Sequence, residues 1–358
     1  MAMSGGVDSS VTAALLVEKG YRVIGVTMQI WDPAVTEVNG EHVGCCSLAA
    51  VEDARKTADV LGIPHYVVNL RRPFQEKVVD YFCREYLAGR TPNPCIACNR
   101  YIKFEALLSR ALAMEADAVA TGHYARLSFD PERGRYLLRR ARDRRKDQSY
   151  ALYTITQEQA ARLLFPLGDY TKEEVRAIAA RKKLPVANKA ESQEICFVVS
   201  GKYGDFIREK TGERPRPGPF LDLQGRVVGE HRGIPYYTVG QRRRLGLAFG
   251  ERVYVVAVDA RKNAVVVGPE EALWGSELVS VDNNFILFDG LEGPLEVEAQ
   301  IRYRAPAAPA VIAPVENGEN GGVHVRFREP QRAITPGQAV VFYREDYVVG
   351  GGTIWKKS

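Results

Sequence analysis

Two groups of residues in this sequence have the types and spacing that chemistry requires. The first is the glycine-rich run Ser4-Gly5-Gly6-Val7-Asp8-Ser9-Ser10, directly ahead of an amphipathic run from Val11 to Lys19. Glycines let the backbone approach an anion, and the N–H groups of residues 6 to 10, the helix dipole and the hydroxyls of Ser9 and Ser10 would face it. No Gly-Lys-Ser/Thr follows, so this is not a Walker P-loop. The run predicts a phosphate site; an ordinary strand-to-helix turn is the structural alternative.

The second group consists of cysteines, all of which lie in the first 200 residues. Six are too few for a secreted disulfide framework, so their clustering indicates metal or catalytic chemistry. Cys95 and Cys98 lie in a Pro-rich predicted loop, and Cys196 lies about a hundred residues later. We interpret Cys45, Cys46 and Cys83, which lie in or beside helical patterns, as buried hydrophobic residues.

The composition bounds the class of protein. The chain has 358 residues, 46% hydrophobic and 26% charged, with a formal net charge of +5, which excludes collagen-like, disordered and disulfide-scaffold classes. No apolar run of about 18 or more residues exists to span a membrane. No signal peptide is visible, so we expect a cytoplasmic protein with no membrane partner, and a monomer.

Alternating elements must position both groups of residues. Strand-like runs at 21–28, 65–70 and 118–122 alternate with helical periodicity, which predicts βαβ units and a parallel sheet. Thr171 to Glu174 form a capping box that opens a further helix. After Trp274 only short β-branched runs remain, which predicts a small antiparallel barrel or sandwich. We therefore expect a catalytic domain at 1–200, a small central domain at 201–274 and a β-barrel-like domain at 275–358.

The glycine-rich run resembles the SGGxDS signature of the ATP pyrophosphatase (PP-loop) family, which cleaves ATP between the α- and β-phosphates. The resemblance implies an α/β fold, a parallel sheet with helices on both faces, and ATP with Mg²⁺ as cofactors. It assigns the ATP site to Ala2, Met3, Ser4, Gly5, Gly6, Val7, Asp8, Ser9, Met28 and Gly122. Met28 would pack on the adenine, with core packing as the alternative. The family normally has a full strand ahead of the loop, so we expect the chain to be truncated at its N-terminus.

Further motifs in order along the whole chain resemble one family in particular, the bacterial tRNA-specific 2-thiouridylases of the MnmA type. They are Gly44 to Ser47, Asn93 with Cys98, Gly122-His123, Lys146-Asp147-Gln148, Ser192 to Phe197, His231 to Gln241, Arg302-Tyr303-Arg304, Pro336-Gly337-Gln338 and Gly350 to Gly352. The resemblance implies replacement of O2 of the wobble uridine (U34) in the anticodon arm of tRNA by sulfur. Adenylation of O2 by ATP would come first, with pyrophosphate released into the loop.

The family pattern also implies roles for the cysteines. Cys196 would carry sulfur as a persulfide, and Cys98 would resolve it by forming a Cys98–Cys196 disulfide. The sulfur donor would be a protein, either a cysteine desulfurase or a sulfur relay protein. Many members have Asp in place of Cys95, so here Cys95, Cys98 and Cys196 could hold a [4Fe–4S] cluster or zinc. We favour the cluster for this variant, and the persulfide interpretation stays open.

The resemblance implies a set of tRNA contacts: Asn93, Pro94, His123, Lys146, Asp147, Gln148, Arg302, Tyr303 and Gln338. Arg133 to Lys146 contains eight basic residues in fourteen, interpreted either as a phosphate-binding stripe or as a solvated face. His123 could equally be a core histidine.

Three other functions compete with tRNA 2-thiolation. A PP-loop ligase or amidating synthetase on a small substrate would need neither paired cysteines nor a basic stripe. A non-catalytic RNA-binding module would not need an intact loop. A 4-thiouridine synthetase would place sulfur at C4 and would have a further RNA-binding domain ahead of the loop.

Overall fold

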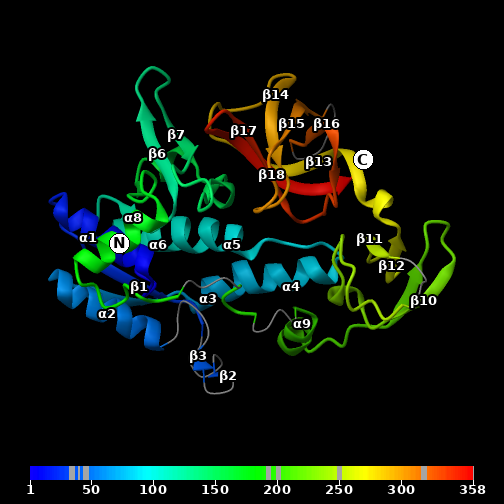
Figure 1. Ribbon diagram of the computed structural model, residues 1–358, viewed down its shortest axis with the longest axis horizontal. Coiled ribbons are helices and arrows are strands. Elements are labelled where there is room, and N and C mark those ends of the chain that lie inside the picture. Colours follow the sequence, from blue (N-terminus) through cyan, green and yellow to red (C-terminus); the bar gives the residue numbers. More distant parts are fainter. Residues whose placement is uncertain are drawn as a thin grey trace. The chain divides into compact units, whose positions relative to one another are not determined.

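The computed structural model describes residues 1–31, 48–190, 195–198, 203–247, 252–315 and 321–357, and the backbone of 37–38 and 41–42 (Figure 1). Residues 44–47, with Cys45 and Cys46, and residues 192–194 lie outside the described part. The chain divides into two compact units. The first contains Met1–Val78, Pro94–Val199 and Glu345–Val348, and the second contains Val79–Asn93, Ser200–Arg344 and Val349–Ser358.

The first unit is built on a parallel sheet with the start of the chain at its centre. β1 (Gly25–Gln29) pairs in parallel with β4 (His65–Asn69), and Ala2 bridges Val26 on the other side of β1. The Ala2 N–H donates to the carbonyl of Ala120 in β5 (Val119–Ala120) at 2.9 Å, and β5 pairs in parallel with β8 (Leu163–Leu164). The order across the sheet is therefore β4, β1, residues 1–3, β5, β8, which confirms the predicted parallel sheet.

Helices built from small and β-branched residues pack around this sheet. α1 (Val7–Glu18) follows residues 1–3, and its Ala13 packs with Ala54 and Ala58 of α2 (Leu48–Leu61). Small side chains let the two helices approach closely. Val7 and Val11 share a second core with α8 (Lys172–Arg181). Thr171 and Glu174 form both hydrogen bonds of the predicted capping box at the start of α8.

The strand order reverses between residues 1–3 and β5. In open α/β sheets, ligands bind at such a reversal, outside the carboxyl ends of the strands. Residues 1–3 lead into the glycine-rich loop, and β5 leads into Thr121, Gly122 and His123. The fold therefore places two of the predicted nucleotide segments at one edge of the sheet.

Helices with π-type turns connect β4 to β5. They are α3 (Arg71–Phe74), η2 (Gln75–Val79), α4 (Asp80–Leu87), α5 (Pro94–Ala97), η3 (Cys98–Ala106) and α6 (Leu107–Ala113). Two of these helical stretches are π-helical, η2 and η3, where helical periodicity predicts α-helix. After β5 come the hairpin β6 (Ala125–Asp130) and β7 (Arg135–Arg140), then η4 (Ser149–Leu152) and α7 (Gln157–Ala160). β2 (Glu37–Val38) and β3 (Glu41–His42) form a short antiparallel pair.

The second unit contains α4, α9 (Tyr203–Thr211) and two β structures. Tyr86 of α4 stacks on Tyr203 of α9 at 5.8 Å between ring centroids. A four-stranded sheet has the order β10 (Val227–His231), β9 (Gly218–Leu221), β12 (Ala264–Gly268), β11 (Tyr254–Asp259). The short helices η6 (Ile234–Tyr236) and η7 (Glu270–Leu273) flank it.

A closed antiparallel barrel completes the second unit. Its strands run in the order β13 (Trp274–Phe285), β16 (Val323–Arg332), β15 (Ala308–Pro314), β14 (Leu295–Gln300), β17 (Ala339–Arg344) and β18 (Tyr347–Lys357). Pairing of β13 with β18 closes the ring, which removes the exposed strand edges. Leu278, Val325 and Phe342 are buried inside it. The predicted barrel is confirmed.

None of the helices in the described ranges is long and apolar enough to cross a membrane.

Candidate nucleotide and cysteine site

The glycine-rich loop takes a conformation that only glycine fits at Gly5. Its φ is +66°, and a Cβ there would lie 2.1 Å from the carbonyl oxygen of Ala50. Ser9 closes the loop: its hydroxyl donates to the Gly6 carbonyl at 3.0 Å and accepts from the Ser4 N–H at 3.2 Å. No described side chain caps α1 at Gly6, and the first N–H groups of an α-helix have no partner within the helix, which suits them to bind an anion.

Ser10 corrects the sequence prediction. Its hydroxyl donates to Thr57 of α2 at 3.4 Å, and the side chain is fully buried between the two helices. Ser10 follows Ser9 by one residue and therefore leaves α1 about 100° further round the helix, so it faces the core. Of the two serines, only Ser9 belongs to the loop.

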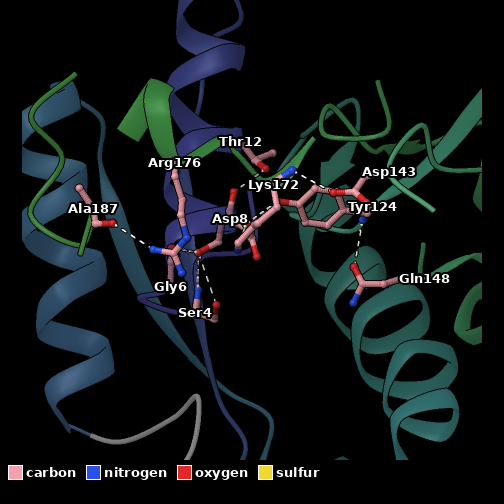
Figure 2. A network of polar contacts seen from close by, with 11 residues as sticks. Ser4, Gly6, Asp8, Thr12, Tyr124, Asp143, Gln148, Lys172, Arg176 and Ala187 are labelled. Atoms are coloured by element: carbon pink, nitrogen blue, oxygen red, sulfur yellow. Dashed lines mark hydrogen bonds and ion pairs between the residues drawn. The ribbon is translucent and has the colours of Figure 1, made fainter. Parts of the chain in front are cut away.

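Asp8 is the charged centre of the site (Figure 2). Its Oδ1 accepts from the Lys172 ammonium at 2.7 Å and from the Tyr124 hydroxyl at 2.8 Å. Only 8% of the Lys172 side chain is exposed, against 33% of Asp8. The Lys172 ammonium also lies 5.8 Å from the centre of the Tyr124 ring. A shielded positive charge beside the start of α1 suits the binding of a phosphate chain.

Two further side chains hold Lys172 and Tyr124 in place (Figure 2). Asp143 accepts from the backbone N–H of Lys172 at 3.1 Å, and Gln148 accepts from the backbone N–H of Tyr124 at 2.9 Å. Asp143, the only acid in the basic stretch 133–146, is buried. The hydrogen bonds therefore connect the end of that stretch to the loop through the backbone of Lys172.

Gly122 packs directly against the start of α1. A Cβ at Gly122 would lie 2.9 Å from the carbonyl carbon of Asp8 and from the nitrogen of Ser9. Met28, the other residue predicted to contact the nucleotide, is half-buried in β1 near its carboxyl end. Its neighbour Thr27 donates to the Met3 carbonyl at 2.8 Å, which ties β1 to residues 1–3.

Lys189 and Arg176 approach the site from α8 and the segment after it. The Lys189 ammonium donates to the Gly5 carbonyl at 3.0 Å and to Asp53 at 2.5 Å. Arg176 donates to the Ala187 carbonyl at 3.5 Å (Figure 2). The segment that leads toward Cys196 is thus connected to both the loop and α8.

Cys98 is the first residue of η3 and is half-buried, whereas Cys95 in α5 is exposed. Asn99, next to Cys98, is buried and donates to the Ala151 carbonyl at 2.9 Å. This hydrogen bond anchors the start of η3 on η4. Because α5 runs directly into η3, Cys98 lies in the second turn of a continuous helical segment that begins at Pro94.

Cys196 is half-buried in a turn that its neighbour Phe197 anchors. Phe197 stacks on Trp31 at 6.1 Å and meets Phe74 edge-on at 5.6 Å between ring centroids. Phe74 belongs to α3, which packs against η3, the helix that Cys98 begins. Cys98 and Cys196 are therefore both carried by segments that pack on α3.

The three predicted metal ligands are not brought together. Within the described residues, which include Cys95, Cys98 and Cys196, no three His, Cys, Asp or Glu side chains are grouped so that they could hold a metal ion. The described residues show no metal site, so the expected [4Fe–4S] cluster or zinc ion is not confirmed. Burial raises the pKa of Cys83 to about 11, which fits its predicted structural role.

The predicted tRNA residues of the first unit have internal partners. His123 is buried between Phe104 and Phe165, with its Nδ1 2.7 Å from the Thr121 hydroxyl. Burial, and then the charge of Lys103, lower the pKa of His123 well below its usual value. These contacts favour its interpretation as a core histidine.

Asp147 and Lys146 lie in one turn at the end of the basic stretch 133–146. Asp147 accepts from the Ala141 N–H at 2.8 Å and from the Ser149 hydroxyl at 2.7 Å, and burial raises its pKa. Lys146 is half-buried in the same turn. The exposed arginines before it are in ion pairs: Arg142 with Glu174, Arg144 with Asp346 and Arg145 with Glu173.

The predicted tRNA residues of the second unit lie in the barrel and in the segment before Pro94. Tyr303 is 42% exposed, and Arg302 donates to the Arg332 carbonyl at 2.9 Å. Gln338 donates to the Thr91 carbonyl at 2.7 Å, two residues ahead of the half-buried Asn93. Pro94, the first residue of α5 in the first unit, is buried.

Sequence reasoning missed Lys172, Tyr124 and Lys189 as site residues. In the sequence, Lys172 is recognisable only as the second residue of a capping box. A capping box predicts where a helix starts and does not predict a contact with Asp8. The pairs Asp8–Lys172 and Gly5–Lys189 join positions 164 and 184 residues apart. The glycine-rich motif predicts the loop, whereas the positions of Lys172 and Lys189 beside it depend on the tertiary fold.

Three family models together match most of the chain. A model described as "tRNA methyl transferase HUP domain" matches residues 1–200, and one described as "tRNA methyl transferase PRC-barrel domain" matches residues 204–269. A third, "Aminomethyltransferase beta-barrel domain", matches residues 276–354.

Relatives named tRNA-specific 2-thiouridylase MnmA match along nearly their whole length. The chain is 62% identical over 355 residues to the protein of that name from Pelotomaculum thermopropionicum, covering 99% of this chain and 96% of the relative. It is 61% identical over 356 residues to that from Desulforamulus reducens, with coverage of 99% and 96%. It is 60% identical over 354 residues to that from Moorella thermoacetica, with coverage of 99% and 98%.

Proposed function

The chain belongs to the tRNA-specific 2-thiouridylase family, and from that premise we propose that it transfers sulfur to C2 of the wobble uridine of tRNA in a reaction driven by ATP. The ATP-dependent step of this proposal is supported by the cluster of Asp8, Lys172 and Tyr124 at the start of α1. It lies where the strand order of the sheet reverses, and Gly122 packs against the backbone of Asp8 and Ser9 there.

The first step activates the uridine. A uracil carbonyl is a poor electrophile, so its oxygen must become a leaving group. O2 attacks the α-phosphorus of ATP, the bond between the α- and β-phosphates breaks, and pyrophosphate departs into the loop of Gly5 and Gly6. The backbone N–H groups of the loop and the Lys172 ammonium offset the charge that develops on the departing phosphates. Mg²⁺ would neutralise the triphosphate, and the partly exposed carboxylate of Asp8 is a suitable oxygen ligand for it.

The second step delivers sulfur. The terminal sulfur of a persulfide on Cys196 attacks C2, and AMP leaves with the electron pair of the C2–O2 bond. The Cys98 thiolate then attacks Sγ of Cys196, which forms a Cys98–Cys196 disulfide and releases 2-thiouridine. A dithiol reductant restores both thiols. The packing of both cysteine segments on α3 supports this pairing.

The remaining assignments follow the same proposal. Residues 1–200 form the catalytic domain, 201–274 a central domain, and 275–358 a tRNA-binding barrel. The tRNA anticodon arm contacts the protein at Asn93, Lys146 and the barrel residues Arg302, Tyr303 and Gln338. A cysteine desulfurase or a sulfur relay protein loads Cys196, and the protein acts as a monomer in the cytoplasm.

The test is a thiolation assay with defined products. Purified protein is incubated with ATP, Mg²⁺, unmodified tRNA, cysteine and a cysteine desulfurase, and the digested nucleosides are analysed by mass spectrometry. We expect 2-thiouridine at the wobble position, with AMP and pyrophosphate formed in step with it. Sulfur at C4, or AMP formation on a small substrate without tRNA, would overturn the proposal in favour of a 4-thiouridine synthetase or a ligase.

A further inference from the structure

Lys189 joins the glycine-rich loop to a second helix. Its ammonium donates to the Gly5 carbonyl at 3.0 Å and to Oδ2 of Asp53, on α2, at 2.5 Å. The two side chains are 38% and 31% exposed, so the pair is accessible to water and is not a core contact. The backbone N–H of Lys189 donates to the Val186 carbonyl at 2.9 Å, which fixes the turn that carries the lysine.

The contact with Gly5 determines where the next N–H group points. Within a planar trans peptide unit, the carbonyl of one residue and the N–H of the next point in opposite directions. The peptide between Gly5 and Gly6 is trans, as are all the described peptide bonds. Because Lys189 holds the Gly5 carbonyl on its own side, the Gly6 N–H is directed away from the lysine, into the loop.

This peptide unit needs such a restraint. Two adjacent glycines rotate with little steric penalty, so a peptide flip between them costs less than anywhere else in the loop. A flipped unit would present the Gly5 carbonyl oxygen to the phosphates in place of the Gly6 N–H, and would replace attraction by repulsion. Ala50, whose carbonyl oxygen fills the Cβ position of Gly5, excludes any stiffer residue there.

Asp53 decides how the lysine is used. A lysine near a phosphate site ordinarily binds the phosphate itself as a point charge. Here the carboxylate of Asp53 holds the ammonium beside α2 and offsets its charge, which leaves the hydrogen bond to Gly5 as its contact with the loop. The proposed function assigns the phosphates to Lys172, on another segment, which donates to Asp8 at the start of α1.

We propose that Lys189 is a positioning residue: it orients the Gly5–Gly6 peptide so that the Gly6 N–H faces the pyrophosphate part of ATP. The inference rests on the proposed function, because it assigns the anion held by the loop. It concerns the affinity for pyrophosphate and leaves the sulfur chemistry of Cys98 and Cys196 unaffected.

The test measures pyrophosphate binding without tRNA. Full-length Lys189→Met protein is titrated with inorganic pyrophosphate and Mg²⁺ in a calorimeter, beside the wild type. We expect the dissociation constant to rise about tenfold, the size of a lost hydrogen bond to a charged group. Lys189→Arg keeps a donor and should recover most of the affinity. In the thiolation assay, KM for ATP should rise in parallel while the dissociation constant for tRNA stays unchanged.

Lys182→Met is the matched control, because Lys182 pairs with Glu18 of α1 on the protein surface, away from the loop. It should bind pyrophosphate as the wild type does. Asp53→Asn keeps the lysine as a donor to Gly5, so it should not reproduce the loss of affinity in Lys189→Met. Wild-type affinity in a folded Lys189→Met protein, or an equal loss in Lys182→Met, would refute the positioning role. Wild-type protein that binds pyrophosphate but does not thiolate tRNA would refute the proposed function alone.

Discussion

The Lys172 ammonium lies 2.7 Å from Oδ1 of Asp8, although the two residues are 164 positions apart in the chain. The lysine is almost fully shielded from water, whereas the carboxylate is one-third exposed. Removing one partner of such a pair leaves the other charge uncompensated, which costs more than the pair itself contributes. The same pair sits at the end of α1 where a phosphate chain would bind, so its loss should affect both stability and ATP chemistry.

Lys172→Met should reduce tRNA-dependent AMP and pyrophosphate formation at least about tenfold, because it removes a positive charge facing the phosphates. It should also lower the free energy of unfolding by about 1–3 kcal/mol, because Asp8 loses its partner. Both quantities can be measured on the same preparation. Asp8→Ala should suppress pyrophosphate release as well, and an unchanged rate would contradict its assignment to the site.

The double variant separates the two effects. If the pair acts as a unit, Asp8→Asn combined with Lys172→Met should be less unstable than the sum of the single changes. The rate of AMP formation by the double variant should nevertheless stay low. Recovery of AMP formation in the double variant would show that the pair is only structural.

Cys196→Ser and Cys98→Ser should both abolish thiolation while leaving the adenylation step, read as AMP formation, within about threefold of the wild type, because sulfur enters only after activation. Cys83→Ser is the control, since this thiol is buried and its pKa of about 11 keeps it protonated. Loss of AMP formation in Cys196→Ser would place this cysteine in the ATP site and not in sulfur transfer.

Cys95→Ala distinguishes the two sulfur mechanisms. Because the structure does not group the three thiols as metal ligands, we expect this variant to keep most of its thiolation activity. Anaerobically purified protein should contain less than one iron per chain. A stoichiometric cluster, lost together with activity in Cys95→Ala, would contradict the persulfide mechanism.

Gly122→Ala should weaken nucleotide binding. Its methyl group would lie 2.9 Å from the backbone of Asp8 and Ser9, so the start of α1 has to shift. We expect the KM for ATP to rise at least about tenfold, as overpacking of about 1–3 kcal/mol would give. Gly290→Ala, where no atom lies within 4 Å of the new methyl group, serves as control and should leave KM unchanged.

His123 should make the protein less stable in mild acid. Burial, then the charge of Lys103, hold the pKa of His123 well below the ordinary 6.5, so below pH 6.5 the unfolded chain takes up a proton that the folded one does not. The free energy of unfolding therefore falls as the pH drops below 6.5, by at most about 1.4 kcal/mol per pH unit for this group.

Thermal midpoints between pH 5 and 8 measure this effect. His65 and His231 shift in the same direction, so His123→Gln should flatten the acid limb only in part. The contribution of His123 should be level above about pH 7, where the histidine is neutral in both states. The Met1 ammonium, whose pKa burial lowers to about 6, adds a slope that continues up to about pH 8 and that His123→Gln leaves unchanged. An equally steep acid limb in His123→Gln would exclude a contribution from this residue.

Much of the fold follows from local patterns. The β-branched runs at 65–70 and 118–122, the capping box at Thr171 and the short strands after Trp274 all appear where the periodicity predicts them. The π-helical segments do not follow from periodicity, because a π-turn shifts the hydrophobic face by only one residue. Ser10 was assigned to the wrong side of α1 because a motif lists neighbours in sequence, whereas a helix separates them by about 100°.

The sequence by itself determined the loop. The loop and the start of its helix lie within one short stretch, which contains Gly5, Gly6 and Asp8. Its geometry therefore depends on residues that are neighbours in the sequence. Tertiary structure alone decided which cations surround the loop, Lys172 and Lys189, and that His123 is buried. Contacts between residues more than 160 positions apart leave no periodic trace in a single sequence. They arise only when helices and strands pack, because packing brings their side chains within hydrogen-bonding distance.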